Sequence, residues 1–168
     1  MYLSRTRWPP REWGGSDRTA QSIIDTLKEE HKMVLSELAE LSEKGTSNRE
    51  QKYSTMKESL LPHLVGEEKV LYPRTREEPE MRDISLEGIE EHGAVKTLLS
   101  QLDSASTAEE DVWVAKMRVI QENVAHHIRE EEDQLFPAMQ KKMSSDELST
   151  LNTRYEDAKK AVLPVAPR

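Results

Sequence analysis

The chain contains no cysteine among its 168 residues. Disulfides, cysteine-ligated zinc and iron–sulfur sites and thiol nucleophiles are therefore excluded. Aromatic residues are also scarce, at 5%, so the core must be built mainly from aliphatic side chains and methionine. Long apolar runs are missing, and the N-terminus has no apolar leader. We therefore expect no membrane span and no secretory signal, which makes the cytoplasm the expected compartment.

Basic stretches are likewise missing from a chain whose formal net charge is -8. Without a basic stripe to pair with phosphates, nucleic acid is not expected as a partner. Charged residues make up 33% and hydrophobic residues 35% of the sequence, which is typical of a soluble helical protein. The length suits one ordinary domain with its own core.

Three segments divide the sequence. Residues 1–18 carry one Pro pair, one Gly pair and two of the three tryptophans, which predicts an irregular arm. We expect this arm to contact the rest of the chain, a second copy in a homodimer or a protein partner; a flexible, partly vector-derived tail is the alternative. Residues 19–142 form the predicted helical bundle, and residues 143–168 a short C-terminal helix and tail.

Apolar residues recur at spacings of three and four from residue 19 onward, which predicts successive amphipathic helices. The first ends near Gly45. Capping boxes predict the starts of the second, fourth and fifth helices, at Ser47-x-x-Glu50, Thr107-x-x-Glu110 and Ser144-x-x-Glu147. Pro73 and Pro79 are expected to mark the end of the second helix, and Val112, Val119 and Asn123 are expected on the inner face of the fourth. Four such helices with short connections favour an all-α fold, an antiparallel up-down four-helix bundle.

An eleven-residue pattern occurs twice, as HLVGEEKVLYP at 63–73 and HIREEEDQLFP at 127–137. Each copy has His, then Glu four and five places on, then Leu, an aromatic residue and Pro. The sequence EEH precedes each copy by one helix, ending at His31 and at His92. The chain therefore reads as two copies of one helical hairpin.

Four histidines share the apolar faces of the four helices, one on each: His31, His63, His92 and His127. Two of them have a Glu one turn later, at Glu67 and Glu131, where both side chains reach the same point. Burying these groups in an apolar core is costly without compensation. Two metal ions would compensate, each held by two His and bridged by both carboxylates, and iron suits these donors. A metal-free bundle with hydrogen-bonded histidines is the structural alternative.

His126 is a further histidine with a Glu four places on, but the repeat assigns the inward position to His127. The Leu-aromatic-Pro triplet stands eight to ten residues after His127, as it does after His63. His126 is therefore expected to face solvent or to hydrogen-bond beside the site. Tyr72 and Phe136 are expected to pack, with a redox role for Tyr72 as the minor alternative.

Residues 22–140 resemble the hemerythrin-like domains of the HHE cation-binding family, on the strength of the two EEH motifs and the two eleven-residue patterns. The resemblance implies a four-helix bundle around two oxo- or hydroxo-bridged iron ions. Matched position by position, it implies as ligands His31, His63, Glu67, His92, His127 and Glu131. Oxygen-carrying members have a further histidine where this chain has Lys96, so that the ligand set is closer to that of the iron–sulfur-repair and nitric-oxide-responsive branch.

The function expected from this resemblance is binding of, or reaction with, O2, NO or peroxide. Peroxidase-like, catalase-like or NO-reducing turnover is included in it. The alternative is an iron- or oxygen-sensing, storage or delivery module without turnover of its own. Manganese or zinc in place of iron stays open at this point, because the same donors bind both.

Overall fold

A computed structural model of the protein describes residues 21–162, and these are helical with no strand. The four long helices are α1 (Ile23–Leu41), α2 (Arg49–Gly66), α4 (Arg82–Asp103) and α5 (Glu110–Glu130). A further helix, α7 (Ser145–Lys160), follows them. The all-helical prediction is thus confirmed for the described range. The predicted arm, residues 1–18, lies outside it.

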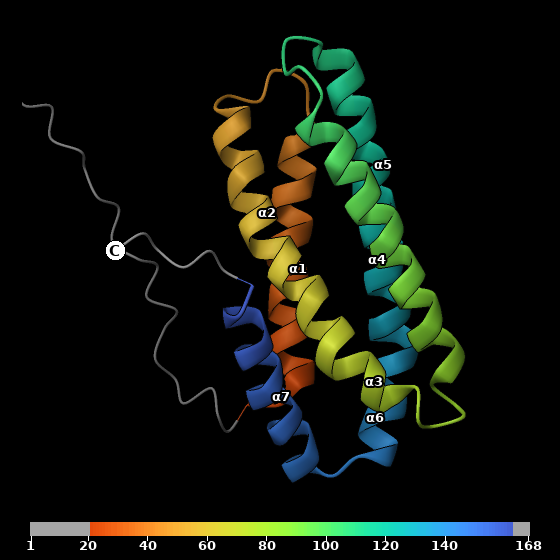
Figure 1. Ribbon diagram of the computed structural model, residues 1–168. Coiled ribbons are helices and arrows are strands. Elements are labelled where there is room, and N and C mark those ends of the chain that lie inside the picture. The colour runs from red at the N-terminus through yellow and green to blue at the C-terminus, as the bar shows by residue number, and fades with distance from the viewer. Residues whose placement is uncertain (1–20, 163–168) are drawn as a thin grey trace, which may run out of the picture.

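The long helices lie side by side, with α7 alongside one part of the assembly (Figure 1). Helix α1 packs against α2, α5 and α7, and α4 packs against α5. Helix α7 packs against α2 as well as α1, so it covers the α1–α2 pair. Within residues 21–162, no helix has both the length and the apolar character needed to cross a membrane.

Each copy of the repeated pattern contains a π-helical turn. The turns are η1 (Glu67–Leu71) and η2 (Glu131–Leu135), and each continues directly into a short α-helix, α3 (Tyr72–Thr75) and α6 (Phe136–Lys142). The helical run therefore passes Pro73 and ends at Thr75, between the two prolines predicted to mark its end. A proline lacks the N–H of a regular helix and collides with the carbonyl four residues earlier. The wider π turn, in which the amide of Tyr72 donates to the carbonyl of Glu67, carries the helix past this point.

Helix starts agree with the capping-box predictions in one case of three. The hydroxyl of Ser144 accepts a hydrogen bond from the amide of Glu147, as predicted. Helix α2 instead begins after Asn48, which has a left-handed backbone (φ 53°) and makes no side-chain cap bond. Thr107 likewise does not cap α5; its hydroxyl donates to Glu50, because contact with the neighbouring loop competes with local capping.

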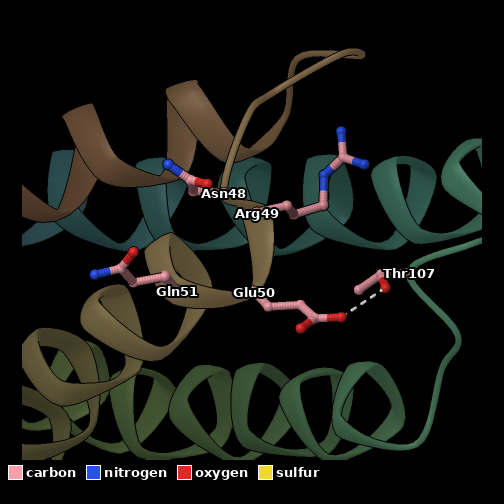
Figure 2. A pocket seen from close by; sticks show the side chains of 5 residues that line it. All are labelled: Asn48, Arg49, Glu50, Gln51 and Thr107. Atoms are coloured by element: carbon pink, nitrogen blue, oxygen red, sulfur yellow. Dashed lines mark hydrogen bonds between the residues drawn. The ribbon is translucent and has the colours of Figure 1, made fainter. Parts of the chain in front are cut away.

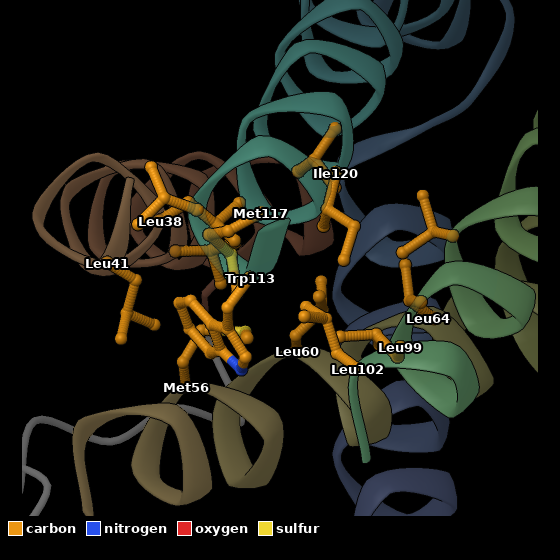
Figure 3. Close-up of a cluster of buried hydrophobic side chains, with 14 of the residues drawn as sticks. Leu38, Leu41, Met56, Leu60, Leu64, Leu99, Leu102, Trp113, Met117 and Ile120 are labelled. Carbon is orange, nitrogen blue, oxygen red and sulfur yellow. The ribbon is translucent and has the colours of Figure 1, made fainter. Parts of the chain in front are cut away.

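Two apolar clusters fill the interior. Cluster A joins side chains of α1, α2, α4 and α5 around Trp113 (Figure 3). It consists of Val34, Leu38, Leu41, Met56, Leu60, Leu64, Val95, Leu99, Leu102, Trp113, Val114, Met117, Ile120, Val124 and Ile128. Cluster B, at the α7 end, consists of Ile23, Ile24, Leu27, Val70, Leu71, Tyr72, Met81, Leu135, Phe136, Met139, Met143, Leu148, Leu151 and Tyr155.

The inner face of α5 differs from the predicted one. Val112 and Val119 are exposed by 48% and 45%, and Asn123 is only half-buried. Trp113 and Met117 occupy the interior instead, since they fall on the same stripe as His127 at helical spacing. The predicted stripe mixed residues from two neighbouring faces.

Candidate metal centre

The four predicted inward histidines lie in a polar layer between the two apolar clusters. His31 lies between Leu27 of cluster B and Val34 of cluster A along α1. The side chains of His31, His63, His92 and His127 are all buried, none more than 4% exposed. His126, by contrast, has a side chain 53% exposed, as the register of the repeat predicts.

Glu67 lies between histidines from three helices. Its Oε1 is 3.2 Å from Nε2 of His63 and 4.0 Å from Nε2 of His31. Its Oε2 is 3.3 Å from Nε2 of His92. The carboxylate is completely buried, and its two oxygens face different histidine pairs.

Glu131 occupies the corresponding place in the second copy. Its Oε2 is 3.3 Å from Nε2 of His31 and 3.7 Å from Nε2 of His127. Its Oε1 accepts a hydrogen bond of 2.9 Å from the hydroxyl of Tyr72. That hydroxyl is also 3.3 Å from Nε2 of His92 and 3.1 Å from Nε2 of His127. Tyr72 therefore packs as expected but also brings a hydroxyl into the polar layer.

A carboxylate stands behind each histidine, at Nδ1. Glu132 is 2.8 Å from Nδ1 of His31, and Glu30 is 2.9 Å from Nδ1 of His63. The second copy repeats this arrangement at 3.0 Å for Glu68 and His92, and at 2.7 Å for Glu91 and His127. An acceptor at Nδ1 keeps the proton there, so the lone pair of Nε2 faces the interior.

Sequence reasoning missed these four carboxylates, although the signal was present. Glu30 and Glu91 are the residues directly before His31 and His92 in the two EEH motifs, and each binds the histidine of the neighbouring helix. Glu68 and Glu132 are the second acids of the repeated pattern. Their duplication was visible, but which histidine each one contacts depends on how the helices pack.

Several polar atoms at the centre of the layer have no hydrogen-bond partner: Nε2 of His31, both oxygens of Glu67 and Oε2 of Glu131. In addition, the Nε2 atoms of His92 and His127 lie only 3.1 Å apart. Two lone pairs at this distance, beside buried carboxylates, require a proton or a cation between them. The donor set therefore fits metal ions, and two groups have the necessary spacing: His31, His63 and Glu67; and Glu67, His92 and His127.

Without metal, the charges favour protons in the same place. Burial lowers the pKa of His31, but the carboxylates of Glu131 and Glu67 outweigh it and raise that pKa to about 10. For His92, burial is again outweighed, by Glu67 and Glu68, and the pKa rises to about 9. Burial raises the pKa of Glu67, but His63, together with His31 and His92, holds it well below its ordinary value. A metal ion therefore competes with protons for these sites.

Two basic side chains contact the outer carboxylates. Lys96 occupies the position of the further histidine described for the oxygen-carrying proteins. Its ammonium group binds Glu68, 2.5 Å from Oε1. Lys159 of α7 forms an ion pair with Glu30. His126 has its Nε2 3.6 Å from carboxylate oxygens of both Glu91 and Glu130, so it lies beside the polar layer and in solvent.

A surface pocket of about 410 Å³ lies far from these residues (Figure 2). It is lined by Asn48 to Gln51 and by Thr107, whose hydroxyl donates to Glu50 across it. Along α2, the distance from Arg49 to His63 is about 20 Å. The pocket is therefore separate from the candidate metal centre.

Comparison with known proteins yields one family and two curated relatives. The family described as the hemerythrin HHE cation binding domain matches residues 22–139. A protein named DNA nickase from Nostoc sp. is 29% identical over 149 residues, which is 88% of this chain and 42% of that protein. An uncharacterized hemerythrin-like protein from Schizosaccharomyces pombe is 30% identical over 105 residues, 61% of this chain and 51% of that one. The chain thus spans about half the length of these relatives. No solved structure matches it significantly.

Proposed function

Because the chain belongs to the hemerythrin HHE cation-binding family, we propose that it is a non-haem di-iron protein that binds or reacts with O2, NO or peroxide. The proposal includes an antiparallel up-down four-helix bundle formed by α1, α2, α4 and α5. Each histidine pair would hold one iron, and both carboxylates would bridge. The proposed ligands are His31, His63, Glu67, His92, His127 and Glu131.

The observation that supports this most directly is the set of buried, unpartnered atoms on His31, Glu67 and Glu131. Such atoms cost free energy in an apolar interior unless a cation neutralises them. Imidazole and carboxylate together are donors that iron accepts well. The carboxylates at Nδ1 support the same conclusion, since they hold the imidazoles in the tautomer that metals bind.

Two iron ions can together exchange two electrons with a small molecule, as reduction of peroxide or of two NO molecules requires. The chain's own residues supply the surroundings of that chemistry. Burial, with Glu131 and Glu67 nearby, raises the pKa of Tyr72 well above its ordinary value. Its hydroxyl therefore keeps a proton beside His92 and His127. Clusters A and B keep bulk water away on both sides.

Metal content and an optical spectrum test the proposal. Protein loaded with iron(II) and exposed to air should hold about two irons per chain and absorb in the near-UV through ferric charge transfer. His63→Ala and Glu131→Ala should each lose most of this iron, whereas His126→Ala, an exposed control, should keep it. Full iron in either ligand variant would overturn the ligand assignment. Spectral change on adding peroxide or NO would then identify the reactive molecule.

Storage or delivery of iron is the second candidate function, and Glu91 favours it. One oxygen of Glu91 contacts the buried His127, and the other contacts the exposed His126. This gives a polar connection from the metal layer to solvent that exchange of iron would need. Iron that a chelator removes within minutes, together with no spectral response to peroxide or NO, would support storage over reaction.

For partners, we propose a cytoplasmic protein that does not bind nucleic acid, with the N-terminal arm as the contact to a second copy or another protein. We do not propose nickase activity for this chain from the name of the Nostoc relative, since this chain spans 42% of that protein. The net charge of -8 also disfavours contact with phosphates. Nicking of supercoiled plasmid by the iron-loaded chain would contradict this part of the proposal.

A further inference from the structure

Helix α7 lies beyond the residues that the family match covers, 22–139, yet it reaches the candidate metal centre. Tyr155 is completely buried, and its hydroxyl donates a hydrogen bond of 2.5 Å to Oε2 of Glu30. The same hydroxyl is 3.0 Å from Nδ1 of His63. Tyr155 thus contacts both members of the carboxylate–histidine pair that would orient one proposed ligand.

The neighbouring backbone is shaped for this side chain. A Cβ at Gly66 would lie 2.5 Å from Cε2 of the Tyr155 ring, a distance that real Cβ atoms do not tolerate. Only glycine therefore lets the ring reach Glu30 over α2. On the next turn of α7, Lys159 adds an ion pair to the same carboxylate. Glu30 thus receives two donors from α7 besides its contact with His63.

Within residues 21–162, the second half of the site has no equivalent of Tyr155. Glu91, the counterpart of Glu30, contacts the exposed His126 and no buried hydroxyl is recorded for it among the described residues. Counting 64 residues on from Gly66, the interval that separates the two patterns, gives Glu130. A long acidic side chain therefore occupies the place where the first half leaves room for an aromatic ring. The two halves of the site therefore differ both in sequence and in packing.

We propose that Tyr155 is a positioning residue that makes the two proposed metal positions unequal. A carboxylate that already accepts other protons is a weaker acceptor for Nδ1–H. Glu30 accepts from both the Tyr155 hydroxyl and the Lys159 ammonium, whereas Glu68 behind His92 accepts from the Lys96 ammonium alone, so His63 would donate the least electron density through Nε2. An iron held by His31 and His63 is then easier to reduce than one held by His92 and His127. This inference rests on the proposed di-iron function.

Tyr155→Phe keeps the ring against Gly66 and removes only the hydroxyl, so it tests the inference in the full chain. Tyr53→Phe is the matched control, since the Tyr53 hydroxyl donates to Leu99 and Asp103, away from the metal layer. Both variants and the parent protein are loaded with ⁵⁷Fe(II), oxidised, and examined by Mössbauer spectroscopy and redox titration.

We expect two unequal ferric doublets in the Mössbauer spectrum of the parent protein. Tyr155→Phe should shift one doublet and lower the midpoint potential of one iron. Tyr53→Phe should change neither the doublets nor the potentials. Unchanged spectra and potentials in Tyr155→Phe would overturn the inference, as would equal shifts of both doublets. If the parent protein itself fails to hold two irons, the proposed function fails, which is a distinct outcome.

Discussion

The two halves of the polar layer share their ligand pattern and differ in what surrounds it. In the first half, Phe136 stacks on His31 with ring centroids 5.8 Å apart. In the second, the corresponding aromatic residue is Tyr72, whose hydroxyl reaches His92 and His127. The repeat therefore accounts for the shared donors, and single departures from it account for the differences.

The space around these aromatic residues differs in the same way. A Cβ at Gly88 would lie 2.9 Å from the hydroxyl of Tyr72, so that hydroxyl depends on glycine at this position. Counting back the 61 residues between His92 and His31 gives Leu27, a fully buried member of cluster B. The half with a tyrosine has glycine there, and the half with phenylalanine has leucine. Each aromatic residue and its neighbour complement each other in volume.

Protonation of the metal-free protein tests whether the halves behave alike before metal binds. The folded pKa of His31, about 10, and of His92, about 9, both exceed the ordinary 6.5. A raised folded pKa stabilises the protein fully below about pH 6.5, and this contribution is lost as pH rises through the folded value. We expect urea unfolding of the metal-free protein to show a loss on the order of 6 kcal/mol between pH 7 and pH 10, with the larger share from His31.

His126→Ala is the control for this measurement, because its side chain is half exposed and should leave the slope unchanged. Two separate steps would show that the histidines of the two halves titrate one after the other, and one merged step that they titrate together. Stability that stays constant or rises over this range would contradict the assignment of protons to the polar layer.

Removing one Nδ1 acceptor from each half compares the halves with metal bound. Glu30→Gln and Glu91→Gln keep shape but remove the charge that orients His63 and His127, and such changes typically weaken metal binding by about 10–100-fold. We expect the greater loss for Glu91→Gln, because Glu30 already accepts from Tyr155 and Lys159 and is the weaker acceptor for its histidine. Competition with a chelator of known affinity measures both; equal affinities for the two variants and the parent protein would show that these carboxylates do not support metal.

Much of the centre was predictable from sequence because its donors follow helical spacing. Buried histidines at His31, His63, His92 and His127 were identified from their apolar neighbours, and the exposure of His126 from the register of the repeat. The acids on the same helix, such as Glu67 after His63, follow from the i, i+4 rule. Local periodicity therefore sufficed to place the candidate donors, while their role as ligands stays a prediction.

Contacts between helices were not predictable in the same way. Tyr155 and Glu30 are 125 residues apart, and no periodicity connects them. The wrong capping boxes have a similar cause, since Thr107 binds Glu50 across a loop contact. In each of these cases the observed contact is determined by tertiary packing and not by the local sequence pattern.

Alanine at the glycines gives a smaller and more local comparison of the halves. A Cβ at Gly66 meets the Tyr155 ring, and one at Gly88 meets Tyr72 at 2.9 Å and His127 at 3.2 Å. Overpacking of this kind costs about 1–3 kcal/mol, and the higher helix propensity of alanine returns about 1 kcal/mol. We expect Gly66→Ala to destabilise the metal-free protein by about 1–2 kcal/mol and Gly88→Ala by less, because its closest contacts are at greater distances.

Gly93→Ala separates packing from helix propensity in that comparison. Gly93 is an exposed residue of α4, and a Cβ there would meet nothing within 4 Å. Alanine should therefore stabilise the protein by about 0.5–1 kcal/mol through propensity alone, measured by the same urea unfolding. If all three variants instead gained stability to a similar degree, the rings of Tyr155 and Tyr72 would have to move freely. The contacts that distinguish the two halves would then contribute nothing to the free energy of unfolding.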